Sequence, residues 1–207
     1  MRLRLLSTTL LLALYAWTTG CWPNPPLPPP DPDWLIVPGE RAGPITATTT
    51  EADLIAHYGA AAVQVDTLVL SEGFVEVGTR LLPGTPDEVA ILWDEARIHP
   101  SVLRISGDST RWRTAEGVTV GMTRQQLERI NGMPFDLMGF GSNYAGRSTS
   151  WRDGALSGAL SVWMERTVTV PKDEMVDLME QVPFPSDHPL MRRLNLRVHT
   201  VEVHLFR

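Results

Sequence analysis

The sequence predicts an α+β domain in which a mostly antiparallel sheet has helices packed on one face. Short β-rich segments outnumber helical segments and follow one another along the chain, which is typical of antiparallel sheets. A capped helix with the same spacing of Thr, Leu and Gly occurs twice, so two tandem α-β units are expected. About 160 residues follow a proline-rich segment, which is enough for one domain with a buried core.

The first 20 residues have the composition of a secretion signal. Arg2 and Arg4 precede an apolar run at residues 10–17, which is too short to span a bilayer and leads to Gly20-Cys21. Gly20-Cys21 resembles the lipobox of bacterial lipoproteins. The resemblance implies that residues 1–20 are a signal peptide and that Cys21, the only cysteine, becomes the lipidated N-terminus. A plain secretory signal followed by an incidental cysteine is the alternative.

A lipid anchor at Cys21 would place the chain in the bacterial cell envelope, facing the periplasm. Trp22 follows the cysteine where Asp would favour the inner membrane, so the outer membrane is expected. Residues 21–43 then predict an extended tether in the polyproline II conformation, in which each residue adds about 3 Å of length. Its prolines are Pro23, Pro25, Pro26, Pro28, Pro29, Pro30, Pro32 and Pro38.

Residues 44–207 form the expected α+β domain, with unit one at 44–114 and unit two at 115–207. In unit two, Thr123 and Gln126 fit a capping box at the start of a helix, and Gly132 ends that helix. Unit one repeats the pattern with Thr50 and Asp53. Two ordinary capped helices without any duplication are the alternative interpretation.

The remaining segments are predicted from their apolar periodicity. Residues 172–182 favour an amphipathic helix, because their apolar side chains recur every three or four positions. A turn is expected at residues 80–86, and a glycine-rich loop at 139–146 is expected to join two strands. Further strands are expected at residues 63–70, 74–77, 88–93, 102–106, 118–120, 159–170 and 198–206.

The segment Gly121-Met122-Thr123, with Leu127, Gly132 and Pro134 behind it, resembles the BamE/SmpA class of small outer-membrane lipoproteins. The tandem arrangement resembles the β-lactamase inhibitor protein fold. Two further segments, residues 139–141 with Trp151 and residues 186–189, are similar to an uncharacterised family of bacterial lipoproteins. These resemblances imply a non-enzymatic envelope protein that binds other proteins.

Aromatic side chains give the candidate partner-binding residues. Phe140, Tyr144, Trp151 and Trp163 could form a patch that receives a protein, because aromatic residues are enriched among interface anchors. A wide hairpin loop that merely displays Phe140 and Tyr144, with Trp151 in the core, is the alternative.

Catalytic and metal-binding patterns are weak in this sequence. Ser186, Asp187 and His188 have the residue types of a hydrolytic triad, but sequence neighbours do not converge as triad members do. His199 and His204 are five positions apart on one expected strand, which predicts opposite faces and no shared metal. The glycines at 139–146 precede β-rich sequence and not a helix, so no phosphate loop is expected. No cofactor or metal is therefore predicted.

The formal charge of −6 also excludes some partners. Removal of the leader with Arg2 and Arg4 makes the side-chain charge −8, which argues against nucleic acid and against electrostatic binding to anionic lipid. The leading hypothesis is a non-catalytic, lipid-anchored binding or scaffolding module. The alternatives are a periplasmic hydrolase that uses Asp187, His188 and a distant serine, and an inhibitor or immunity-type protein.

Overall fold

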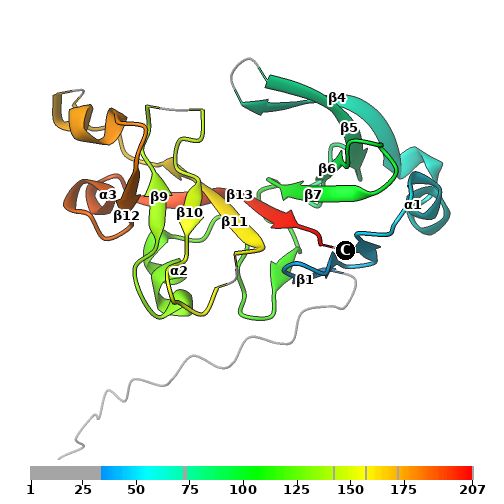
Figure 1. The fold of residues 1–207 in the computed structure, drawn as a ribbon, viewed down its shortest axis with the longest axis horizontal. Helices are drawn as coiled ribbons and strands as arrows, with labels where there is room; N and C mark the ends of the chain where they lie inside the picture. Colours follow the sequence, from blue (N-terminus) through cyan, green and yellow to red (C-terminus); the bar gives the residue numbers. More distant parts are fainter. Residues whose placement is uncertain (1–33, 72–73, 142, 157, 172, 207) are drawn as a thin grey trace, which may run out of the picture.

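The computed structural model describes residues 34–206, apart from residues 72–73, 142, 157 and 172. The predicted signal peptide and Cys21 lie outside the described residues. The described chain is a mixed α+β domain with mostly antiparallel sheets and few helices, as the sequence predicted at this level (Figure 1).

The largest sheet has six antiparallel strands in the order β11-β13-β7-β6-β5-β4. β7 and β13 are neighbours in this sheet, and Leu103 lies opposite Val203. Strands β4 to β7 follow one another as a meander, whereas β13 comes from the end of the chain. The six strands are β4 (Val63–Ser71), β5 (Phe74–Leu81), β6 (Val89–Trp93), β7 (Pro100–Ile105), β11 (Leu160–Arg166) and β13 (Leu196–His204).

A second sheet continues this one beyond β11. It consists of β9 (Asp136–Met138), β10 (Ser148–Ser150) and β12 (Pro183–Pro185), in the order β10-β9-β12. The link is a bridge between Arg147 and Trp163, beside which the Met164 N–H donates to the Gly146 carbonyl at 2.9 Å. The glycine-rich loop joins β9 to β10, as the sequence predicted.

A third, small sheet contains β3 (Ile45–Thr46), β2 (Arg41–Ala42), β1 (Leu35–Val37) and β8 (Arg113–Thr114), and its β1–β8 pair is parallel. This sheet corrects the boundary of the predicted tether, because residues 34–43 belong to the folded domain. Ile36 and Ala42 are buried in the core. The proline run ends at Pro32, and burying the apolar residues that follow outweighs the single Pro38.

Both predicted capped helices are confirmed. In α1 (Glu51–Tyr58) and α2 (Arg124–Asn131) the capping threonines, Thr50 and Thr123, take part in complete capping boxes. Gly59 and Gly132 end the two helices with positive φ angles of 86° and 81°, a conformation that costs glycine little. The short helices are η2 (Ala60–Ala62), of 3-10 type, and α3 (Pro189–Arg193).

The predicted amphipathic helix at 172–182 is wrong in type and length. The structure has a 3-10 helix there, η3 (Asp173–Met179), with Lys172 outside the described residues. Met175 and Leu178 are buried, but Met179 and Val182 are exposed. A 3-10 helix has three residues per turn, so Met175 and Leu178 lie on the same face and both point to the core.

Some predicted strand boundaries also change. β5 extends to Leu81, so the turn at 80–86 starts later, and β11 ends at Arg166. Residues 118–120 form no strand, although Val118 is fully buried.

One hydrophobic cluster unites these elements. Leu54 of α1, Leu127 of α2 and Trp112 pack with the inward side chains of the large sheet, including Val201 and Val203. Fully burying one Leu or Val side chain stabilises the fold by about 2 kcal/mol. Because side chains alternate along a strand, Glu202, which lies between these two valines, points to the opposite face of the sheet.

Candidate functional site

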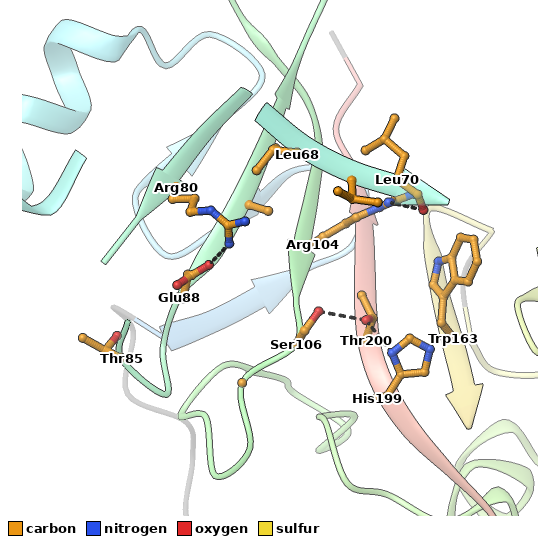
Figure 2. Close-up of a pocket in the computed structure, with 13 residues that line it drawn as sticks. Leu68, Leu70, Arg80, Thr85, Glu88, Arg104, Ser106, Trp163, His199 and Thr200 are labelled. Carbon is orange, nitrogen blue, oxygen red and sulfur yellow. Dashed lines mark hydrogen bonds and ion pairs between the residues drawn. The ribbon is translucent and has the colours of Figure 1, made fainter. Parts of the chain in front are cut away.

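The face of the large sheet that points away from the core carries polar and aromatic side chains; we call it the open face. Two hollows occupy it, of about 420 and 470 Å³, and Arg104 and Trp163 line both (Figure 2 shows the first). Glu202 and His204 of β13 line the second hollow. Charged and aromatic side chains therefore meet in both hollows of the open face.

Glu202 and four side chains around it form one network, which we call the Glu202 cluster: Arg104, Arg147, Trp163, Glu202 and His204. The Glu202 carboxylate accepts hydrogen bonds from Arg104 Nε at 2.8 Å and from Arg147 Nη2 at 2.8 Å. Trp163 Nε1 also donates to it, at 3.2 Å, and His204 Nε2 lies 3.1 Å from it. These side chains come from β7, β11 and β13, and Arg147 directly precedes β10.

The charge of the cluster follows from the pKa of Glu202. Burial by itself would raise this pKa, but the hydrogen bonds from His204 and Arg147 and the charges of Arg147 and Arg104 outweigh it and lower the pKa far below its ordinary value. Glu202 is therefore ionised at neutral pH. Two guanidinium groups share this single carboxylate, so the cluster keeps a net positive charge.

Two guanidinium groups lie beside the ring of Trp163. The guanidinium carbons of Arg104 and Arg147 lie 5.3 Å and 5.9 Å from its ring centroid, within cation–π range. Together with the indole hydrogen bond to Glu202, these contacts hold Trp163 and both arginines in one arrangement.

The first hollow lies between β4 and the Glu202 cluster. Arg104 Nη1 donates to the Leu70 carbonyl at 3.2 Å, which ties β4 over the open face (Figure 2). On the facing wall, the Ser106 and Thr200 hydroxyl oxygens are 2.8 Å apart (Figure 2). His199 borders the same hollow, and burial lowers the pKa of its imidazole despite the nearby charge of Glu165.

The structure brings together two of the four aromatic residues that the sequence singled out. Tyr144 and Trp163 both line the second hollow, with ring centroids 6.2 Å apart, and Tyr144 is exposed. Phe140 is half-buried against the core beneath Arg166. Trp151 is buried in the core, with its indole N–H donated to the Leu160 carbonyl at 2.6 Å and its ring against Phe135.

The placement of the two histidines on β13 corrects the sequence prediction. His199 and His204 line hollows on the same face of the sheet. The pairing of β13 with β11 skips His199, since Trp163 lies opposite Thr200 and Met164 opposite Val198. Such a β-bulge shifts the two-residue alternation by one position. Among the described residues, no group of three or more His, Cys, Asp or Glu is placed to hold a metal ion.

The Ser186-Asp187-His188 segment has a structural arrangement. His188 caps α3, with its Nδ1 accepting from the Leu190 N–H at 3.3 Å. The Ser186 hydroxyl is buried and donates to Glu128 at 2.6 Å, while it accepts from the Phe135 N–H. Within the described part of the chain, no serine hydroxyl bonds to His188. The geometry therefore gives the hydrolase hypothesis no support.

The sequence reasoning missed Arg104, Arg147 and Glu202. A signal for Glu202 exists, because it is a charged residue between two valines in a strand whose alternate side chains are apolar. Its two arginine partners are 98 and 55 positions away, so their pairing depends on the strand order.

In the part of the chain that the structure describes, no helix has the length and apolar character needed to cross a membrane. Comparisons of the chain with protein-family models, curated proteins and solved structures found no match.

Proposed function

We propose that this protein is a lipid-anchored lipoprotein of the bacterial envelope whose domain binds another protein, without catalysis, through the open face. The observation that carries the proposal is the Glu202 cluster next to the exposed ring of Tyr144. The secretion signal, Cys21 and the proline-rich segment support the anchored, periplasm-facing location, with the outer membrane as the expected one.

The chemistry of the open face suits a protein partner. Arg, Trp and Tyr are the residue types that most often supply binding energy at interfaces. Glu202 and Trp163 already fix Arg104 and Arg147, so these two arginines lose less side-chain entropy when a partner binds than free arginines would. The net positive charge of the cluster favours a partner that presents a carboxylate.

We also propose that the domain consists of two tandem units with their helices on one face of the sheet. Support comes from the order of elements, because α1 precedes β4, β5, β6 and β7, and α2 precedes β9, β10, β11 and β13. Across the sheets these strands lie in the order β9-β10-β11-β13-β7-β6-β5-β4, so the two series have mirrored orders. β12, which lies between β11 and β13 in the chain, is an addition to the second series and pairs with the outer edge of β9. Leu54 and Leu127 of the two helices enter the same core.

Affinity capture from detergent-solubilised membranes tests the proposed function. The wild-type chain should recover a specific envelope protein, and Tyr144→Ala should reduce its yield at least fivefold. Phe206→Ala is the matched control, because Phe206 is an aromatic residue exposed to a similar degree and lines neither hollow. Equal loss with both variants, or no specific protein with the wild type, would contradict the proposal.

Two further readouts separate the parts of the proposal. Mass spectrometry of the N-terminal peptide should find acyl chains on Cys21, and a free thiol there would remove the anchor. Capture of a soluble enzyme in place of a membrane protein would favour the inhibitor-type alternative, to which the tandem arrangement gives some support.

A further inference from the structure

The second hollow contains a cationic group that the fold leaves unused. Arg147 donates to Glu202 from Nε at 3.2 Å and from Nη2 at 2.8 Å, so this edge of its planar guanidinium faces the carboxylate. Nη2 also donates to the Ser161 hydroxyl, at 3.2 Å. Nη1 lies off this edge, and no described residue accepts a hydrogen bond from it. In the described chain, the buried side-chain nitrogens without a partner belong to His99 and Arg113, so Arg147 Nη1 reaches solvent.

The two hollows differ in their charge. The second hollow contains the Glu202 cluster, in which two guanidinium groups share one carboxylate and leave a net positive charge. In the first hollow, Arg80 forms ion pairs with both Asp66 and Glu88, so two carboxylates share one guanidinium (Figure 2 shows the pair with Glu88). An anionic group is therefore attracted to the second hollow and disfavoured beside Arg80.

The second hollow also has an apolar wall. Its volume of about 470 Å³ is more than a carboxylate alone would fill. The side chains of this wall come from β6, β7, β9, β11 and the loop before β10: Leu92, Val102, Met138, Trp163 and Tyr144. A ligand that uses the whole hollow must therefore carry an apolar group close to its negative charge.

We propose that the second hollow receives the C-terminal residue of the partner protein, with its α-carboxylate on Arg147 Nη1 and an apolar side chain against the apolar wall. This inference rests on the proposed function, because it names the part of the partner that the open face binds. Capture of a C-terminal carboxylate is a recurring mode of peptide recognition.

The combination of one free cation with an apolar wall selects a chain end over an internal acidic residue. In a C-terminal Leu or Phe, the carboxylate and the apolar side chain are attached to the same carbon atom, so both fit into one hollow. An internal Asp or Glu carries its carboxylate on a short stem, and its own side chain leaves the apolar wall unfilled. A carboxamide at the chain end would also bind less well, because hydrogen bonds between two charged groups are about twice as strong as neutral ones.

Titration of the full-length chain in detergent with synthetic peptides tests the proposal. The probe is N-acetyl-Gly-Ser-Gly-Leu with a free C-terminal carboxylate. The readout is the NMR signal of the Trp163 indole N–H, which is bonded to Glu202 and is assigned by its absence in Trp163→Phe. We expect the free acid to bind about tenfold more tightly than the same peptide with a C-terminal carboxamide.

Two further peptides test the two halves of the recognition. N-acetyl-Gly-Ser-Glu-Leu carboxamide has its only carboxylate on an internal side chain, and N-acetyl-Gly-Ser-Gly-Gly with a free carboxylate has no apolar side chain at its end. Both should bind about tenfold more weakly than the probe, because each satisfies either the cation or the apolar wall in the wrong arrangement.

Variants of the protein locate the binding site. Arg147→Gln should remove the preference for the free acid, whereas Arg166→Gln, at an exposed arginine that lines neither hollow, should keep it. Thr149→Glu leaves the Glu202 cluster intact and adds a negative charge at an exposed position that lines the second hollow. It should weaken binding of the free acid about threefold or more, because like charges repel. Ser150→Glu is its control, since Ser150 is exposed on the same strand and lines neither hollow.

Three results would overturn the inference: equal binding of acid and carboxamide, equal binding of the peptide with the internal Glu, or a preference for the acid that survives Arg147→Gln and Thr149→Glu. The outcome is separate from that of the capture experiment. If capture depends on Tyr144 but the free acid has no advantage, only the chain-end inference fails. If the free acid binds as expected but no protein is recovered from membranes, the proposed envelope partner fails and the carboxylate site stands.

Discussion

Removing the negative charge of Glu202 should destabilise the domain strongly. Glu202→Gln keeps the size and one acceptor oxygen of the side chain but leaves Arg104 and Arg147 without their shared carboxylate. Removing one member of a buried ion pair costs about 3–5 kcal/mol. The Arg104 and Arg147 side chains are 19% and 25% exposed, so water partly solvates their charges in the variant. We therefore expect a loss of unfolding free energy at the lower end of this range, about 3 kcal/mol.

Urea unfolding followed by tryptophan fluorescence measures this cost. For a domain of this size, 3 kcal/mol corresponds to a decrease of the unfolding midpoint by about 1–2 M urea at pH 7. Glu165→Gln is the matched control, because Glu165 is an exposed carboxylate on the neighbouring strand β11, and its change should stay within about 0.5 kcal/mol. A Glu202→Gln midpoint equal to that of the control would refute the electrostatic account of the cluster.

The pH dependence of the same variant gives a second check. The folded-state pKa of Glu202 is lowered from its ordinary value of 4.5, so its stabilising contribution is complete above pH 4.5 and is lost as the pH falls below that value. The difference in unfolding free energy between wild type and Glu202→Gln should therefore be fully present at about pH 5.5. It should shrink progressively in more acidic buffer, and a difference that grows on acidification would contradict the assignment.

Three substitutions test the elements that position the site. Thr123→Ala removes the cap of α2 and should cost about 1 kcal/mol in urea unfolding; a cost near zero would mean that the cap is unimportant. Gly141→Ala places a Cβ atom 1.8 Å from the Met179 carbonyl oxygen, so the loop must move and the melting temperature should fall by several degrees, whereas an unchanged value would contradict the close approach. Trp151→Phe loses the hydrogen bond to the Leu160 carbonyl and fills less of the core, which should cost about 2 kcal/mol; a neutral result would argue against its buried position.

The features that the sequence predicted well are those with short-range causes. Each capping box joins residues three positions apart, Thr50 with Asp53 and Thr123 with Gln126, so the pattern is complete within one helical turn. Most strands of the large sheet also follow from local alternation of apolar residues. The predicted fold class needed only these local signals, which is why its coarse description agrees with the structure.

The errors have causes that local patterns do not contain. The alternation along β13 fails at His199 because the bulge depends on the pairing with β11. The apolar spacing at 172–182 fits both an α-helix and a 3-10 helix, and packing selects the tighter form. The prolines predict a tether up to residue 43, but Ile36 is buried in the core and its strand pairs with β8, which is distant in sequence.

The Glu202 cluster shows why the open face requires the whole domain. Glu202, Arg147 and Trp163 come from the second half of the chain, but Arg104 comes from β7 in the first half. The pairing of β7 with β13, in which Arg104 lies opposite Glu202, joins the two halves. Either half alone would expose this seam, and Glu202 would lose one of its two cations. A partner that binds the open face therefore recognises the assembled pair of halves, even if the two arose as copies of one unit.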